Sequence, residues 1–169
     1  MIQNILLPVV DKQTKVLVVG SMPGVQSLEK QQYYGNPRNH FWGIISELTG
    51  TMVPEQYEER LALVKKHGIG LWDVIRACER VGSLDSNIKN EITNDFVALF
   101  KRYPQIQAVF FNGTKAHDVF KKKLGFELLV GKEYYKMPST SPVPGRNIKT
   151  FDQKVEAWRA LEQYMLRGE

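Results

Sequence analysis

The segment YYGNPRNHFW, residues 33–42, gathers aromatic rings, two asparagines, an arginine and a histidine around one Gly-Asn-Pro turn. Burying these polar side chains without partners would cost about 1–3 kcal/mol for each unpaired group. A role in the hydrophobic core therefore does not account for the segment. Flat rings beside amide donors and acceptors suit a flat, polar ligand instead.

Three further loops offer polar groups. GSMPG, residues 20–24, presents backbone N–H groups near a Gly/Pro turn, which can hold an anion or a polarised oxygen. It lacks the Gly-Lys-Ser/Thr of a Walker loop and the three glycines of a dinucleotide site. Asn112 ends an apolar run, and its amide could read the edge of a base or simply tolerate the left-handed turn before a glycine.

The third loop, PSTSP, sets three hydroxyl groups between two prolines. These hydroxyls suit contact with a phosphate. A serine nucleophile is disfavoured, because G-x-S-x-G is absent and His40, His67 and His117 have no clear Ser or Asp partner by spacing. The single cysteine, Cys78, excludes an internal disulfide and a cysteine metal site, and it is better explained as a small core residue.

Strands alternating with helices must position these loops. Apolar runs predict strands at residues 15–20, 107–112 and 134–138, whereas GIGLWDVI fits either a strand or a helix start. Helical spacing, with Pro54 starting one helix and a Thr or Asn cap at residues 93–94 starting another, predicts helices. Their ranges are 40–50, 54–68, 93–103, 113–125 and 152–165.

This alternation indicates a three-layer α/β fold, with a central, mostly parallel sheet of about four strands flanked by helices. In such folds ligands bind beyond the carboxyl ends of the strands, so we expect the four loops to line one cleft. The length of 169 residues fits a single domain, 1–169.

The composition, with 43% hydrophobic and 24% charged residues, is that of an ordinary globular protein. Neither a basic leader nor an apolar run of about 20 residues is present, so we expect a cytoplasmic protein without membrane contact. The net charge of +5 favours a polyanionic partner without proving one. The lysines at residues 121–123 are equally explained by a solvated helix face.

Taken in order, the loops resemble the motifs of the uracil-DNA glycosylase superfamily, most closely its hypoxanthine (deoxyinosine) DNA glycosylase branch. GSMPG resembles the first motif, and YYGNPRNHFW resembles the Pro-Gly-Asn-His-Phe-Trp segment of the mismatch-specific enzymes. FNGTKA resembles their Phe-Asn-Gly-Lys segment, and MPSTSPV their Met-Pro-Ser-Ser-Ser wedge loop. The resemblance covers residues 16–143.

The resemblance implies an enzyme with the superfamily's fold that extrudes a deaminated base, most closely hypoxanthine, from double- or single-stranded DNA and hydrolyses its N-glycosidic bond. It implies catalytic roles for Asn39, which would hold the attacking water, and for Asn112. It further implies base binding by the N–H groups of Met22 and Gly24, the ring of Tyr34 and the amide of Asn112.

The same resemblance implies that the remaining loop residues contact DNA, with Pro142 and Val143 forming the wedge that replaces the extruded base. The implied DNA-contacting residues are Lys115, Ser139, Thr140, Ser141, Pro142, Val143 and Arg146. A monomer that needs no cofactor and no metal is expected.

Met22 departs from the superfamily, in which the mismatch branch carries asparagine and the main uracil enzymes aspartate at this place. A thioether cannot orient or deprotonate a water molecule. The resemblance therefore moves this role to Asn39. Asp73 is an alternative base, with a helix start or an ion pair as the competing explanation of that carboxylate.

Three other functions stay open. The first is a uracil- or mismatch-specific glycosylase. The second is a DNA-binding relative without activity, for which Met22 is the warning sign. The third is a nucleotide- or phosphate-using enzyme of doubly wound fold, which rests on analogy of fold alone.

Overall fold

A parallel sheet of four strands forms the centre of the structure, a computed structural model that describes residues 1–142 and 148–166. The strand order is β3-β2-β6-β7, and every neighbouring pair is parallel. The strands are β2 (Val16–Gly20), β3 (Ile69–Asp73), β6 (Ala108–Asn112) and β7 (Glu133–Met137). The predicted sheet is confirmed, and GIGLWDVI begins as a strand.

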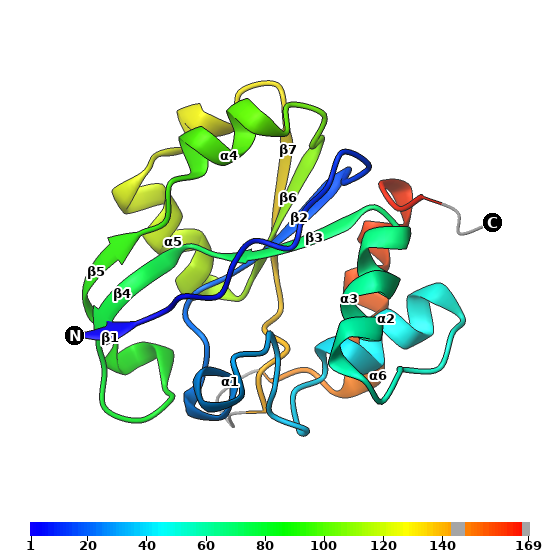
Figure 1. Ribbon diagram of the computed structural model, residues 1–169, viewed down its shortest axis with the longest axis horizontal. Coiled ribbons are helices and arrows are strands. Elements are labelled where there is room, and N and C mark those ends of the chain that lie inside the picture. Colours follow the sequence, from blue (N-terminus) through cyan, green and yellow to red (C-terminus); the bar gives the residue numbers. More distant parts are fainter. Residues whose placement is uncertain (143–147, 167–169) are drawn as a thin grey trace.

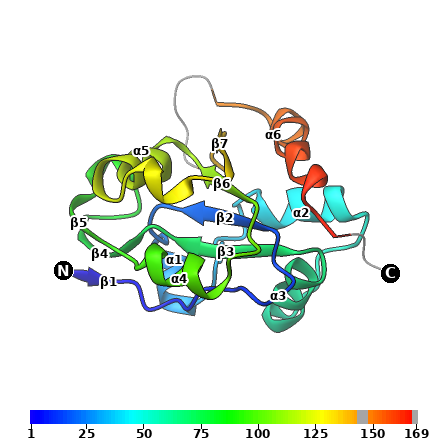
Figure 2. The same cartoon turned by 90° about the horizontal axis from the view of Figure 1, so that it is seen from above.

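Helices cover both faces of this sheet (Figure 1, Figure 2). The helices are α1 (Val25–Lys30), α2 (Phe41–Thr49), α3 (Tyr57–Lys66), α4 (Phe96–Arg102), α5 (Thr114–Lys123) and α6 (Phe151–Trp158). In β2, Val16 and Val18 pack toward α2, α3 and α6, whereas Leu17 and Val19 pack toward α4 and α5. Since both faces of the strand are buried, β2 is apolar throughout. The three predicted layers are confirmed.

A second, smaller sheet was not expected from the sequence. It is antiparallel, with the order β1-β4-β5, and consists of β1 (Ile2–Gln3), β4 (Ile75–Glu79) and β5 (Lys89–Thr93). The pairing of β4 with β5 contains register shifts, and β5 is mostly polar, so the regular alternation that marks a strand is missing. Cys78 in β4 is fully buried, which confirms its place in the core.

Two predicted helix starts are wrong. Helix α3 begins at Tyr57 rather than at Pro54. Helix α4 is capped by Asp95, whose carboxylate accepts a 3.0 Å hydrogen bond from the N–H of Ala98. The pair at residues 93–94 does not cap this helix, because its first member ends β5.

The C-terminal helix α6 begins with a capping box formed by Thr150 and Gln153. It ends at Trp158, after which a 3-10 helix spans Arg159–Gln163. The predicted single helix is therefore two consecutive helical segments. Within residues 1–142 and 148–166, no helix is long and apolar enough to cross a membrane.

Candidate functional site

The carboxyl ends of the parallel strands carry the polar groups that the sequence singled out. β2 ends at Gly20, β3 at Asp73 and β6 at Asn112, and the first two are paired neighbours in the sheet. Tyr34 and Thr140 reach the same edge from their loops, since both contact Asn112. This edge lies at the bottom of the view in Figure 1. The expected convergence of the four loops is confirmed.

Asn112 fastens two of these loops together. Its Nδ2 donates a 2.9 Å hydrogen bond to Thr140 Oγ1, and its Oδ1 accepts one of 3.0 Å from the Thr140 N–H. A longer bond of 3.4 Å joins Nδ2 to the hydroxyl oxygen of Tyr34. The buried amide therefore positions the loop after β7 and keeps one loosely held N–H. Its use in binding a base stays a prediction.

Tyr34 presents an aromatic ring at the same place. Its φ of 54° lies in the left-handed region, which bulky residues seldom adopt. The ring stacks on Phe41 with centroids 4.1 Å apart and planes inclined by 22°. Tyr33, Phe41 and Trp42 are buried and are packing residues, as expected. Tyr34 is half-buried, and its use as a stacking surface for a base stays a prediction.

Asp73 is a carboxyl group held inside the protein, with only 4% of its surface exposed. Burial raises its pKa to about 7, the hydrogen bond from Asn4 opposes this rise, and the charge of Asp85 adds to it. Asn4 Nδ2 donates to Asp73 Oδ2 at 3.1 Å. Both competing explanations of this residue are wrong, because it ends a strand rather than starting a helix and its partner is an amide rather than a cation.

The other oxygen of Asp73, Oδ1, makes no hydrogen bond with the part of the chain that the structure describes. It lies against Gly20, where an added Cβ would be 2.5 Å from this oxygen and 3.6 Å from the Tyr34 hydroxyl oxygen. A side chain at position 20 would therefore fill the space between the two groups. The glycine leaves that space open at the end of β2.

Asn39 lies just before helix α2. Its Oδ1 accepts a 2.9 Å hydrogen bond from the Phe41 N–H. This oxygen keeps a second lone pair, so the predicted hold on a water molecule is compatible with the geometry and stays a prediction. Asn36 makes a bond of the same kind, accepting from the Arg38 N–H at 3.0 Å.

The GSMPG loop offers backbone donors rather than side chains. Met22 is 7% exposed, and its thioether packs in the apolar cluster under α4 and α5. The N–H groups of Met22 and Gly24 donate no hydrogen bond to any described residue, and their use by a ligand stays a prediction. Arg80 Nη2 donates a 2.8 Å hydrogen bond to Pro23 O, and this bond helps to fix the position of the loop.

The residues predicted to contact DNA through PSTSP have unequal surroundings. Ser139 is exposed, and Ser141 and Pro142 are half-buried. Thr140 is 1% exposed, and its hydroxyl accepts the hydrogen bond from Asn112. It therefore supports the loop from inside instead of facing a DNA phosphate. Its contact with DNA was expected because the sequence did not show which of the three hydroxyls points inward.

The remaining predicted DNA contacts are Lys115, Val143 and Arg146. Lys115 forms an ion pair of 3.7 Å with Glu91, which competes with a phosphate for its charge. Val143 and Arg146 lie outside the described residues.

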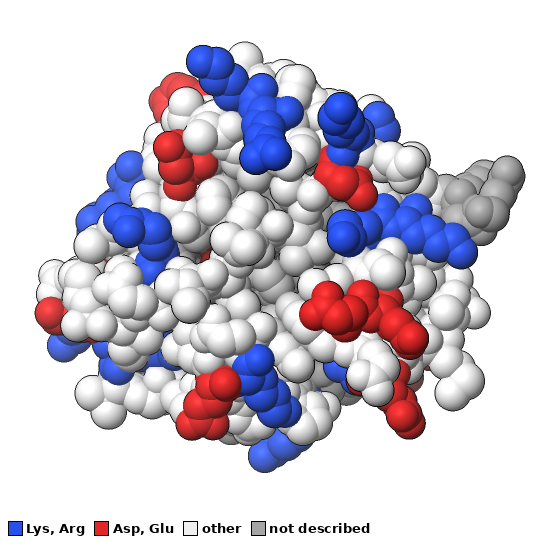
Figure 3. Space-filling view, in the orientation of Figure 1, with Lys and Arg blue, Asp and Glu red and all other residues white. Residues whose placement is uncertain are grey.

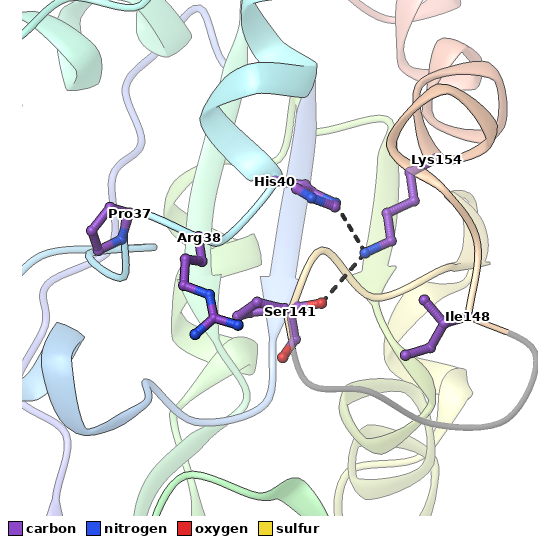
Figure 4. A pocket seen from close by; sticks show the side chains of 7 residues that line it. Pro37, Arg38, His40, Ser141, Ile148 and Lys154 are labelled. Carbon is purple, nitrogen blue, oxygen red and sulfur yellow. Dashed lines mark hydrogen bonds between the residues drawn. The ribbon is translucent and has the colours of Figure 1, made fainter.

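A basic group on α6 was missed by sequence reasoning. Lys154 is 3% exposed, and its Nζ lies 3.1 Å from His40 Nδ1 and 3.4 Å from Ser141 O (Figure 4). Burial lowers the pKa of Lys154, and burial together with the charge of Lys154 lowers the pKa of His40. One signal was present, because Lys154 is one helical turn before Trp158, on the apolar side of an amphipathic helix.

Basic and acidic side chains are interspersed on the face of the molecule seen in Figure 3. The net charge of +5 is therefore not gathered into one basic patch on that face. Among the residues that the structure describes, no group of three His, Cys, Asp or Glu side chains could hold a metal ion.

The fold and the site define an α/β protein whose aromatic and amide groups meet at the carboxyl edge of its sheet. The family model of the Uracil DNA glycosylase superfamily matches residues 7–162. This match spans most of the chain, and the protein belongs to that superfamily. The resemblance noted in the sequence is confirmed.

Individual relatives agree with this assignment. The hypoxanthine DNA glycosylase of Methanosarcina acetivorans is 37% identical over 156 residues, which are 90% of this chain and 93% of the relative. That of Methanosarcina barkeri is 39% identical over 123 residues, 71% of this chain and 78% of the relative. A solution NMR structure from M. acetivorans, described as a candidate uracil DNA glycosylase, has a TM-score of 0.78 at 37% identity and covers 96% of this chain and 99% of its own.

Proposed function

We propose that the protein is a monofunctional DNA glycosylase that releases hypoxanthine from deoxyinosine in DNA and leaves an abasic site. The observation that carries this proposal is the 37% identity, over 90% of the chain, to a relative named hypoxanthine DNA glycosylase. The site supports it, because a ring, an amide and free backbone N–H groups at one sheet edge suit a flat base with polar edges.

The proposed reaction is the hydrolysis of one bond. The oxygen of a water molecule bonds to C1′ of the deoxyribose while the C1′–N9 bond breaks, through an oxocarbenium-like transition state. The electron pair of the broken bond leaves with the base, and the proton that the water loses ends on the released base, so the products are the free base and an abasic site. Donors placed beside the departing base stabilise its negative charge, and the N–H groups of Met22, Gly24 and Asn112 are assigned this role.

Asn39 is assigned to the water, which its second lone pair would orient toward C1′. Asp73 is the alternative group, because a carboxyl with a pKa of about 7 can take a proton from water near neutral pH. The Asp73 assignment predicts a rate that depends on pH near 7, whereas a neutral amide does not titrate in this range.

Extrusion of the base from the stack costs a few kcal/mol. Stacking on one aromatic ring returns about 1–3 kcal/mol, and Tyr34 supplies that ring. Ser139 and Ser141 are assigned to DNA phosphates, and Pro142 to the edge of the wedge. The partner is double- or single-stranded DNA with a deaminated base, and we expect the protein to act as a monomer in the cytoplasm.

Two other candidates are each favoured by one observation. The superfamily match favours release of uracil, including uracil or thymine from a mismatch with guanine. The burial of the Met22 side chain in an apolar cluster favours a DNA-binding relative without activity, since the first motif then holds no water.

Labelled duplexes of one sequence test these functions. Each carries a single deoxyinosine, uracil, thymine mismatch or xanthine, and alkali cleaves the strand wherever a base has been released. We expect cleavage to be dominated by the deoxyinosine duplex. Cleavage dominated by uracil or a mismatch would replace the proposed substrate, and binding without cleavage of any duplex would identify an inactive relative.

A further inference from the structure

Lys154 is a buried cation without a counter-charge. Its ammonium group bonds to a histidine nitrogen and to a backbone carbonyl oxygen, both of which are neutral acceptors. No carboxylate among the described residues forms an ion pair with it. An unpaired buried charge is costly, and an anion bound beside it would offset that cost.

Lys154 and His40 each keep an N–H group that can donate a further hydrogen bond. The ammonium has three N–H groups, of which two serve His40 and Ser141. Because His40 Nδ1 accepts one of them, the neutral imidazole carries its own hydrogen on Nε2. The pair therefore supplies further N–H donors and one positive charge from two different elements.

These donors border a cavity of about 480 Å³ (Figure 4). It is lined by Pro37, Arg38, His40, Ser141, Pro142, Ile148 and Lys154. This set contains two basic side chains, Arg38 and Lys154, and no carboxylate. Arg38 is exposed at the rim, and none of the described carboxylates pairs with its guanidinium. Basic side chains and N–H donors around a cavity whose lining holds no acidic group are the chemistry of a phosphate site.

We propose that the cup formed by Arg38, His40 and Lys154 binds a phosphate group of the DNA backbone beside the extruded nucleotide. This inference rests on the proposed function, because that function makes DNA the molecule that carries the phosphate. The chain segments that form the cup lead directly into the base site, and the His40 N–H donates a 2.9 Å hydrogen bond to Thr140 O. Asn39 lies between two of its residues, and Ser141 follows Thr140, which Asn112 holds in place.

The test is the salt dependence of binding to an undamaged duplex and to a duplex with an abasic site, measured by fluorescence anisotropy. Lys154→Met keeps the length of the side chain and removes its charge. Lys101→Met is the matched control, since Lys101 is exposed in the last turn of α4, a helix that lies away from the carboxyl edge of the sheet in Figure 1. For Lys154→Met we expect affinity about tenfold weaker at low salt and a log–log salt slope shallower by about 0.9, with neither change in the control.

A second arm changes the DNA instead of the protein. Single phosphates around the abasic site are replaced by neutral methylphosphonates. One replacement should weaken the wild type about tenfold and leave Lys154→Met unaffected, because the phosphate and the lysine then act as a pair. A folded Lys154→Met protein with wild-type affinity and slope, or no phosphate coupled to it, would overturn the proposal.

An experiment with inorganic phosphate distinguishes a site for a DNA phosphate from a site for free phosphate. If millimolar phosphate raises the melting temperature of the wild type but not of Lys154→Met, while DNA binding is equal, the cup holds free phosphate and the assignment to DNA is wrong. None of these readouts needs base release. The proposed phosphate site can therefore be wrong although deoxyinosine is cleaved, and it can be correct although no base is released.

Discussion

Asn39 and Asn36 make the same local hydrogen bond, and only Asn39 is assigned a part in the reaction. Asn39→Ala should lower the single-turnover rate of base release by about 10²–10⁴-fold, because the water loses its orienting group. Binding to the duplex should be spared. The rate and the affinity are measured on the same deoxyinosine duplex.

Asn36→Ala is the control for this change. It removes a bond to the N–H two residues further on, as Asn39→Ala does, so both variants disturb the loop in the same way. Equal losses in the two variants would show that Asn39 acts only by shaping the loop. A wild-type rate for Asn39→Ala would remove this residue from the mechanism.

Asp73→Asn should stabilise the protein at pH 8 by about 1–4 kcal/mol. The pKa of Asp73 in the folded state, about 7, lies above the value of 3.8 for a free carboxyl. Its contribution to stability is therefore complete below about pH 4 and is lost as the pH rises through 7. Urea unfolding of both proteins at pH 5 and pH 8 measures the difference, which should be larger at pH 8.

The same variant tests the alternative base. If Asp73 takes the proton of the water, the wild-type rate rises with pH up to about 7 and levels off above it, and Asp73→Asn loses both the rate and this dependence. A wild-type profile that is flat between pH 5 and pH 9 would exclude Asp73 as a base and leave the water to Asn39.

Sequence reasoning found those site residues whose position at the sheet edge follows from the segments next to them in the chain. Tyr34 and Asn112 stand in loops after strands, and both reach the predicted edge. The structural role of Asp73 was predicted wrongly because its hydrogen-bond partner, Asn4, is 69 residues away in the chain and meets it only in the folded protein. Lys154 was missed for the same reason, because its partner His40 is 114 residues away.

At the scale of elements, the loop after β7 depends on Asn112. Asn112→Ala removes both hydrogen bonds to Thr140 and leaves a buried N–H without a partner. We expect a loss of about 1–3 kcal/mol in the free energy of unfolding and slower base release. Thr140→Val, which removes only the side-chain bond, should lose less stability. Equal stability of Asn112→Ala and the wild type would contradict this role.

The sequence predicted those helices and strands whose hydrophobic pattern can be recognised within the segment itself, without knowledge of its partners in the fold. β2 and β6 are short, wholly apolar runs, and α2 and α5 carry one apolar side each. The antiparallel sheet of β1, β4 and β5 was not predicted, because its strands are short or irregular and become a sheet only by pairing. The cap of α4 was misplaced by one or two residues, within a run of three polar side chains.

For the whole molecule, the single domain predicted over residues 1–169 is open to a direct test. Urea unfolding should show one cooperative transition, with coincident midpoints by tryptophan fluorescence and far-ultraviolet circular dichroism. The reason is that both apolar clusters are built on the shared strands β2, β3 and β6. Two separate transitions would instead show that the halves on either side of the sheet unfold independently.

Detection of the released base tests the central claim most directly. The protein is incubated with a deoxyinosine duplex and, at equal concentration, with the matched uracil duplex, and the free bases are separated by chromatography. Hypoxanthine should appear in amounts equal to the abasic sites formed, at a rate that exceeds the release of uracil. Intact deoxyinosine in a duplex that the protein has bound would contradict the account.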